Sequence, residues 1–249
     1  MREFLIALSF FTRIPVKLDN VSEDEFFDSM NLMPLVGILI GLLLWLAGWL
    51  VWFIGYPAGG AVLMILLYLW FTGGLHLDGV ADTGDAVFSA RDRDRMFEIM
   101  KDSRLGSYGA VSLIMLLLTQ FVCFQWMISS YTAALVLVPV IGRTAAVQLV
   151  SWSEPAQQGG GLGKGFCAVT KPWLPVLYGI LLFAACWAFY DVTVTMAAVF
   201  TLFGAMLFIP YFKKTFGGIT GDHIGLSVEL SQVLFMLLII MISGIRAYL

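Results

Sequence analysis

Three aspartates in one short segment have the types and spacing of a metal site. Asp78, Asp82 and Asp85 lie in the stretch His76-Leu77-Asp78-Gly79-Val80-Ala81-Asp82-Thr83-Gly84-Asp85. In an α-helix, at about 100° per residue, these side chains fall within about 60° on one face. Carboxylates this close repel one another unless a proton or cation lies between them, and no basic residue is within a helical turn. We therefore predict that Asp78, Asp82 and Asp85 bind Mg²⁺ for phosphoryl transfer, in preference to forming a solvated surface helix.

A second group of polar residues follows between Lys101 and Gly109, just before a long apolar run. Arg104 suits bidentate binding of a phosphate group. Asp102 is a further ligand or base, or else a cap for the helix that follows, and the sequence leaves these alternatives open. The candidates for the catalytic acid–base residue are therefore Asp82, Asp85 and Asp102.

A glycine–acid element occurs twice in the chain. Gly73-Gly74-Leu75-His76-Leu77-Asp78 and Gly217-Gly218-Ile219-Thr220-Gly221-Asp222 both read Gly-Gly-aliphatic-x-x-Asp. We hypothesise that Asp222 faces the first acids and adds a ligand or a phosphate contact, although so short a match can also arise by coincidence. Glu229 lies seven residues beyond Asp222, which places it on the same face if this stretch is helical.

Two basic residues are further candidates for binding an anion. Arg143 lies inside an apolar stretch, where an arginine is costly and usually faces a wet cavity or an anion; snorkelling to the headgroups is the alternative. Lys164 belongs to the glycine-rich segment Gln157 to Gly165, whose spacing does not match a P-loop. That segment is either a flexible loop or one whose amides and Lys164 contact a phosphate.

The composition places these residues in a membrane protein. Of the 249 residues 60% are hydrophobic and 12% are charged, against about 25% charged in soluble domains. We predict an all-α, polytopic bundle of about seven spans that forms a single membrane-embedded domain, 1–249. A short apolar core near the N-terminus lacks a cleavage site and predicts an interfacial helix. Apolar stretches of sufficient length lie approximately at 32–54, 58–75, 108–128, 133–150, 173–189, 194–212 and 228–245.

Basic residues give the bundle an orientation. With seven spans, the four regions rich in Lys and Arg share one side, which the positive-inside rule assigns to the cytoplasm. The acids at 78, 82 and 85 lie on that side. The basic residues are Arg2, Arg13, Lys17, Arg91, Arg93, Arg95, Lys101, Arg104, Lys164, Lys171, Lys213 and Lys214.

At these motifs the chain resembles the cobalamin synthase family, the adenosylcobinamide-GDP ribazoletransferases. The pattern His-Leu-Asp-Gly-x-Ala-Asp-Thr-x-Asp, followed by Phe-Ser-Ala-Arg and Asp-Ser-Arg-Leu-Gly, is specific to it. The matching segments are Leu8-Ser9-Phe10-Phe11-Thr12-Arg13-Ile14-Pro15-Val16, Thr72 to Asp85, Val87 to Gly109, Gly142-Arg143-Thr144-Ala145-Ala146, Gly161-Leu162-Gly163 and Gly217 to Leu230.

The resemblance implies a Mg²⁺-dependent phosphotransferase of the prokaryotic inner membrane, with its active site on the cytoplasmic face. Such an enzyme joins adenosylcobinamide-GDP to α-ribazole or α-ribazole 5′-phosphate, giving adenosylcobalamin or its 5′-phosphate and GMP. Its partners are these substrates and the lipid bilayer, no nucleic acid is expected, and homo-oligomer formation is left open. The residues expected to bind substrate are Arg13, Arg104, Arg143, Lys164 and Asp222.

Three other classes of membrane protein match the sequence less well. A CDP-alcohol phosphotransferase needs Asp-Gly-x-x-Ala-Arg, and the Ala-Arg pair is missing after Asp78-Gly79. A UbiA-like prenyltransferase needs two Asp-rich motifs, whereas Asp222 stands alone in the second half. A small-solute transporter usually binds its substrate at mid-bilayer on broken helices, but here the acids gather at one interface.

Overall fold

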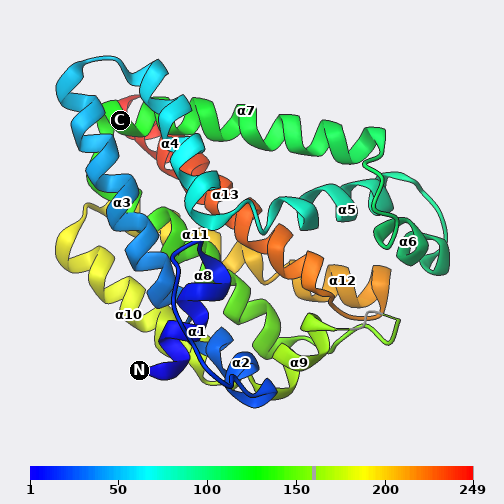
Figure 1. The fold of residues 1–249 in the computed structure, drawn as a ribbon. Coiled ribbons are helices and arrows are strands. Elements are labelled where there is room, and N and C mark those ends of the chain that lie inside the picture. The colour runs from blue at the N-terminus through cyan, green and yellow to red at the C-terminus, as the bar shows by residue number, and fades with distance from the viewer. Residues whose placement is uncertain (159–160, 249) are drawn as a thin grey trace.

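The computed structural model describes residues 1–158 and 161–248, so Gly159 and Gly160 of the glycine-rich loop lie outside the described residues. Strand-like pairing in the described part is limited to one isolated bridge, between Pro155 and Ile219, which confirms the predicted all-α class. The helices (Figure 1) are α1 (Arg2–Phe11), α2 (Glu23–Asp28), η1 (Ser29–Leu32), α3 (Met33–Ile54), α4 (Pro57–Thr72), α5 (Leu77–Phe88), α6 (Arg93–Met100), α7 (Ser107–Ser130), η2 (Thr132–Val136), α8 (Leu137–Trp152), α9 (Leu162–Val169), α10 (Leu174–Phe189), α11 (Val192–Ala205), α12 (Phe208–Phe216) and α13 (Gly221–Tyr248).

Five stretches of the described chain are long and apolar enough to cross a membrane. Two more qualify only as pairs of helices joined at a bend, α4 with α5 at 97° and α9 with α10 at 81°. Counting both pairs gives seven, in agreement with the predicted polytopic bundle. We treat α4 as the membrane segment of its pair and α5 as lying outside it, because α5 carries three carboxylates and turns away. The five stretches are Glu23–Ile54, Ser107–Ser130, Thr132–Trp152, Val192–Phe216 and Gly221–Ala247.

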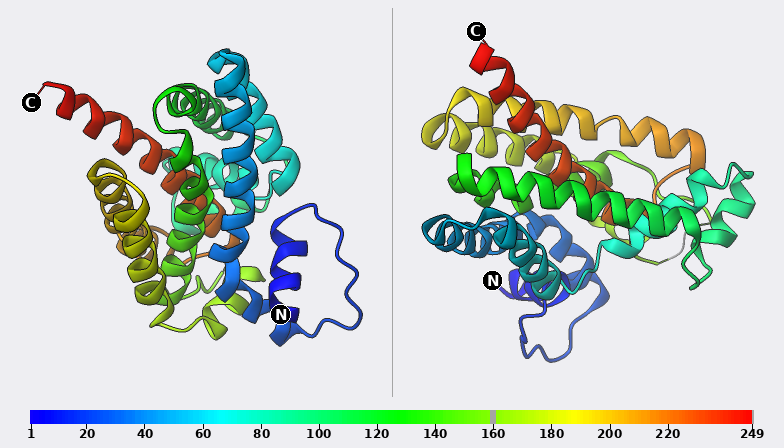
Figure 2. Two further views of the ribbon diagram at one scale, coloured as in Figure 1. Left: turned by 90° about the vertical axis from the view of Figure 1, so that its left-hand side faces the viewer. Right: turned by 90° about the horizontal axis from the view of Figure 1, so that it is seen from above.

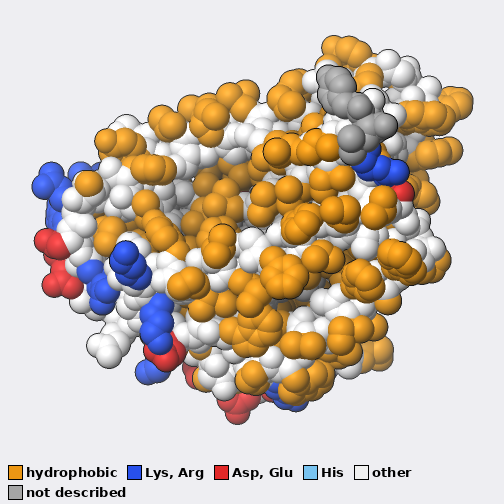
Figure 3. Space-filling view, turned by 180° about the vertical axis from the view of Figure 1, so that it is seen from behind, with side chains coloured by type: hydrophobic (Ala, Val, Ile, Leu, Met, Phe, Trp, Pro, Cys, Tyr) orange, Lys and Arg blue, Asp and Glu red, His pale blue; other side chains and the backbone are white. Residues whose placement is uncertain are grey.

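Hydrophobic side chains cover most of the outside of the bundle. Large side chains such as Trp49 and Phe53 of α3 and Ile180 and Trp187 of α10 are exposed, and Figure 3 shows hydrophobic side chains spread over one whole face. Most charged side chains in that view gather at its left and lower edges. We call this end, which carries α5, α6, α9 and the basic end of α12, the charged edge. An apolar surface this large is typical of a protein that contacts lipid.

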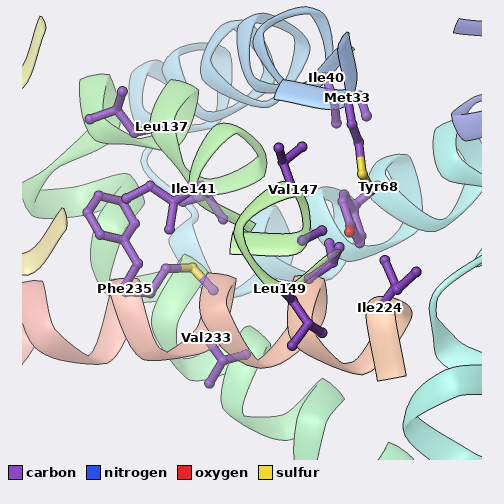
Figure 4. Packing of buried hydrophobic residues seen from close by; sticks show 14 of the residues in the cluster. Met33, Ile40, Tyr68, Leu137, Ile141, Val147, Leu149, Ile224, Val233 and Phe235 are labelled. Carbon is purple, nitrogen blue, oxygen red and sulfur yellow. The ribbon is translucent and has the colours of Figure 1, made fainter. Parts of the chain in front are cut away.

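Helix α8 forms the centre of the bundle and packs between α3 and α13. A methyl group at Gly37 or Gly41 of α3 would overlap the backbone around α8, so these small residues allow close helix packing. Figure 4 shows Met33, Ile141 and Phe235 among the buried residues that α3, α8 and α13 contribute to this core.

The N-terminal segment forms helix α1, at the predicted place. It packs beside η1 and α3 on the outside of the bundle (Figure 2), and it buries Ile6, Ala7 and Phe11. Its location at a membrane interface stays a prediction.

One predicted span is not a single regular helix. The stretch at 194–212 is divided into α11, which ends at Ala205, and α12, which begins at Phe208. Pro210 lies in the first turn of α12, where its missing N–H and its ring prevent it from continuing a helix. Helix α12 continues the same membrane-crossing stretch, and its basic last turn leads at the charged edge to the second Gly-Gly element.

Candidate active site

The three predicted aspartates lie on one short helix, and a pair of glycines before it sets the direction of that helix. Gly73 and Gly74, with φ of +70° and +67°, end α4 and turn the chain, and these left-handed conformations cost glycine little. Helix α5 then begins at Leu77 and includes all three acids, as their spacing predicted. Asp78 is in its first turn, where the helix dipole favours a negative charge.

The second Gly-Gly element builds the same arrangement from the other end of the chain. Gly217 ends α12 with φ of +76°, and α13 begins at Gly221, so Asp222 is in its first turn. The start of α13 lies directly against α5, because a methyl group at Gly79 would overlap the carbonyl oxygen of Asp222. The structure therefore brings Asp222 beside the acids of α5.

The pKa of Asp82 is raised by its surroundings, which include the other three carboxylates. Burial raises the pKa of Asp82 to about 6, and the negative charges of Asp222, Asp78 and Asp85 contribute further. No described residue donates a hydrogen bond to it, and its side chain is half-buried. Among the described residues Asp82 therefore has no positive partner, a situation that a bound cation would relieve.

Asp85 has partners of its own. The backbone N–H groups of Gly106 and Gly109 donate to its two carboxylate oxygens, each at 2.8 Å. Asp85 thus caps the N-terminus of α7 from a neighbouring helix, a role that sequence spacing alone does not indicate. The predicted metal and base roles of Asp85 compete with these two hydrogen bonds.

Asp102 and Arg104 bind each other. Arg104 donates from Nε to Oδ1 at 3.0 Å and from Nη2 to Oδ2 at 2.6 Å, while its side chain is 87% exposed. Hydrogen bonds from Arg104 lower the pKa of Asp102 to about 2. Asp102 is consequently ionised throughout the neutral range and is a weak proton acceptor there.

Two cavities meet beside Asp222, and Leu162, Gly221 and Asp222 contribute to the walls of both. The first, of about 220 Å³, is also lined by His76, Asp78, Gly79, Leu75, Ile224, Gly225, Met30, Phe10, Phe11 and Phe166. The second, of about 270 Å³, is also lined by Phe97, Met100, Lys101 and Thr220. Lys101 was not among the predicted site residues, although its place beside Asp102 in the same motif was a usable signal.

The other basic residues predicted to bind substrate lie at different depths. Arg13 is exposed, and its guanidinium approaches Gly73 at the bend before α5. Lys164 is exposed on α9, which packs on the start of α13 where Gly163 meets Thr220 and Gly221. Arg143, in contrast, is fully buried in α8 and donates to the carbonyl of Pro139 at 3.3 Å.

The number and surroundings of the carboxylates on α5 and at the start of α13 determine whether they fit Mg²⁺. Within the described residues no group of three His, Cys, Asp or Glu side chains is close enough to hold a metal ion by itself. Phosphoryl-transfer enzymes commonly bind Mg²⁺ through one or two carboxylates and the substrate phosphates, with water completing the shell. The unpartnered carboxylate of Asp82 and the exposed one of Asp78 fit that arrangement.

The contact at Gly79 leads to a first prediction. Gly79→Ala should force α5 away from α13, and a misplacement of about 1 Å in an active site costs on the order of 100-fold in rate. We expect turnover in the assay described below to fall by about that factor. We also expect a loss of about 1–3 kcal/mol in unfolding free energy from overpacking.

Gly179→Ala is the matched control, since nothing lies within 4 Å of the added methyl group. It should leave turnover unchanged. Wild-type turnover of Gly79→Ala would show that this contact does not set the geometry of the acids.

Known proteins match the chain through these same elements. A family model described as cobalamin-5-phosphate synthase matches residues 3–240. A protein of Desulfitobacterium hafniense named adenosylcobinamide-GDP ribazoletransferase is 38% identical over 245 residues, which covers 95% of this chain and 96% of the relative. Relatives of the same name from Clostridioides difficile and Clostridium acetobutylicum are 34% and 32% identical, over 96% and 95% of this chain and 97% and 94% of their own lengths.

No solved structure gives a significant match to the chain. The family match, however, runs through the acid helix, the Asp102–Arg104 pair and the start of α13, and leaves only a few residues at each end uncovered. This chain therefore belongs to the cobalamin-5-phosphate synthase family.

Proposed function

We propose that this protein is an adenosylcobinamide-GDP ribazoletransferase, the name its relatives carry. It joins adenosylcobinamide-GDP to α-ribazole or α-ribazole 5′-phosphate and releases GMP. One structural observation carries the proposal beyond the family match. Carboxylates from two distant segments, α5 and the start of α13, meet beside two cavities at the charged edge, and no described basic side chain forms an ion pair with them.

The reaction exchanges one phosphorus–oxygen bond for another. A ribose hydroxyl of α-ribazole attacks the phosphorus next to cobinamide, and the bond from that phosphorus to the bridging oxygen breaks. GMP leaves with the electron pair of the broken bond, and the hydroxyl proton passes to a carboxylate. Because Asp85 is held by α7 and Asp102 by Arg104, Asp222 is the carboxylate best placed to accept it: it lines both cavities.

Asp78 and Asp82 would hold Mg²⁺ together with the diphosphate. The metal, when bound, neutralises the charge that develops on the phosphate oxygens. Lys101 lines the second cavity and supplies a positive charge for the leaving phosphate. Arg13 and Lys164 are exposed near the bend and on α9 and are available to contact the rest of the substrates.

We further propose that the charged edge faces the cytoplasm of a prokaryotic cell and that the bundle lies in its inner membrane. The side rich in Lys and Arg supports this orientation. Nucleotide-activated substrates are made in the cytoplasm, so they would reach the cavities directly.

GMP release tests the function. Purified protein in lipid nanodiscs is given adenosylcobinamide-GDP, α-ribazole and Mg²⁺, and GMP and the corrinoid product are measured by chromatography. We expect both to form in equal amounts and only when α-ribazole is present. Intact substrates after incubation, with substrate binding shown by calorimetry, would refute the proposal, and turnover of a CDP-alcohol instead would favour the rival class.

Dependence on Mg²⁺ and on pH gives a second prediction. A chelator should abolish GMP release and added Mg²⁺ should restore it. A metal ligand must be deprotonated, so protons compete with Mg²⁺ once the pH falls below about 6, the pKa of metal-free Asp82. Apparent Mg²⁺ affinity should therefore be constant above pH 7 and weaken about tenfold per pH unit below 6; a flat dependence from pH 5 to 8 would contradict the role of Asp82.

A further inference from the structure

A buried polar cluster lies inside the bundle around Glu229 of α13. Tyr68 of α4 donates from its hydroxyl to Oε1 of Glu229 at 2.6 Å, and Gln120 of α7 donates from Nε2 to Oε2 at 2.9 Å. Gln232 in turn donates to the Tyr68 hydroxyl at 2.9 Å. None of these four side chains is more than 3% exposed. Figure 4 shows Tyr68 and its hydroxyl oxygen within the hydrophobic core.

A carboxylate in this position is costly unless every partner is in place. The cluster is not spread along one helix, because its hydrogen bonds join α4, α7 and α13. Three helices are thus fixed to one another at the level of Glu229, and the active-site acids begin just beyond the end of α4.

One face of α13 connects the cluster to the acids. Asp222, Gly225 and Glu229 are spaced by three and four residues and share that face. The carbonyl of Asp222 lies against Gly79, and a Cβ at Gly225 would be 3.2 Å from the Cα and carbonyl oxygen of His76. The Nδ1 atom of His76 is 3.6 Å from Oε1 of Glu229. The chain between α4 and α5 therefore rests on α13 from Asp222 to Glu229.

Arg143 supplies the opposite charge to this region. Its guanidinium is fully buried, and its Nε and Nη2 atoms have no hydrogen-bond partner among the described residues. A buried guanidinium and a buried carboxylate within one bundle carry opposite charges, which lowers the cost of placing either there.

We propose that Glu229 is a positioning residue for the acid helix. Its hydrogen bonds to Tyr68 and Gln120 hold the bend between α4 and α5 against α13, and this sets the placement of Asp82 relative to Asp222. The proposal deepens the proposed ribazoletransferase function and rests on it. Its first readout, however, is a property of the metal-free protein and needs no turnover.

The first test is a pair of Tyr→Phe variants that each remove one hydroxyl. Tyr68→Phe removes the 2.6 Å hydrogen bond to Glu229, and Tyr178→Phe removes a 2.6 Å hydrogen bond to the Asn31 carbonyl elsewhere in the bundle. We expect residues 74–82 to exchange amide hydrogen faster in metal-free Tyr68→Phe, and kcat for GMP release to fall about 10-fold or more. Both should stay at wild-type values in Tyr178→Phe.

The second test exchanges the two ends of one hydrogen bond. Gln120→Glu places a second carboxylate against Glu229, and repulsion should loosen the bend, with faster exchange at 74–82 and kcat lowered by about 10–100-fold. Adding Glu229→Gln to the same chain gives a double variant in which the carboxylate is at position 120 and the amide is at position 229, so the contact again joins one carboxylate and one amide. The double variant should recover both readouts, with KM for adenosylcobinamide-GDP little changed throughout.

The outcomes separate the two proposals. Absence of GMP release from the wild-type protein would refute the function, whereas the hydrogen exchange of residues 74–82 would still report on positioning. A folded Tyr68→Phe or Gln120→Glu protein with wild-type exchange at the bend would overturn the positioning role. So would a folded double variant that fails to recover the exchange rate.

Discussion

Asp82→Asn should lower GMP release at physiological Mg²⁺ by at least about 100-fold, because it removes a proposed ligand of the metal. The amide keeps the size of the side chain and loses its charge, so the fold should be retained. Removing one of several repelling carboxylates should in fact stabilise the metal-free protein, since the pKa of Asp82 is raised in the folded chain. Steady-state rates over a range of Mg²⁺ concentrations, with thermal unfolding in parallel, measure both effects.

Asp28→Asn provides the control for this variant. Asp28 is also half-buried, and no described residue donates a hydrogen bond to its side chain, but it lies on α2, outside the cluster. Its replacement should change neither the rate nor the Mg²⁺ requirement. If Asp82→Asn turned over at a near-wild-type rate with an unchanged Mg²⁺ requirement, the metal assignment would be wrong.

Asp222→Asn should produce an equally large loss with a different signature. As the proposed proton acceptor, Asp222 acts on the chemical step, where a general base typically contributes about 10²–10⁴-fold. We expect kcat to fall by this factor while the Mg²⁺ concentration for half-maximal rate stays unchanged. A shift in the Mg²⁺ requirement would make Asp222 a metal ligand, and full activity would remove it from the site.

The helical class and the spans could be predicted because a bilayer imposes a simple length and hydropathy rule on each segment. The common face of Asp78, Asp82 and Asp85 followed from helical periodicity, and the structure shows all three in α5. The repeated Gly-Gly element correctly predicted that Asp222 lies beside the acids of α5, because both copies end one helix and start another. Its role in binding stays a prediction.

Other parts of the site depend on contacts between distant segments. The two N–H groups that hold Asp85 come from the start of α7, and no local pattern around Asp85 signals them. Glu229 was placed on the Asp222 face, but its partners Tyr68 and Gln120 are more than a hundred residues away. The sequence shows that each of three apolar runs contains a polar residue. It does not show which of these polar residues form hydrogen bonds with one another.

The structure decides against one of the alternatives for Asp102. It does not cap α7, whose N-cap residue is Gly106, and it pairs instead with Arg104 two residues later. Its role as an acid of the site stays a prediction. The segment between α6 and α7 is not helical, so an acid and an arginine two residues apart can reach each other there.

The direct backbone contact between α5 and α13 has a genetic consequence. At Gly79 an added methyl group would overlap the carbonyl oxygen of Asp222, so the chain tolerates only hydrogen there. At Gly225 it would lie 3.2 Å from the His76 backbone and would require a small shift. Neither residue takes part in the chemistry. In a growth selection that requires the protein's product, a saturation library should be depleted at Gly79 as strongly as at Asp82 and less strongly at Gly225. Alanine should be tolerated at Gly179 and Gly244, around which there is open space. The pattern of tolerated variation would then trace the line along which the two halves of the polypeptide meet.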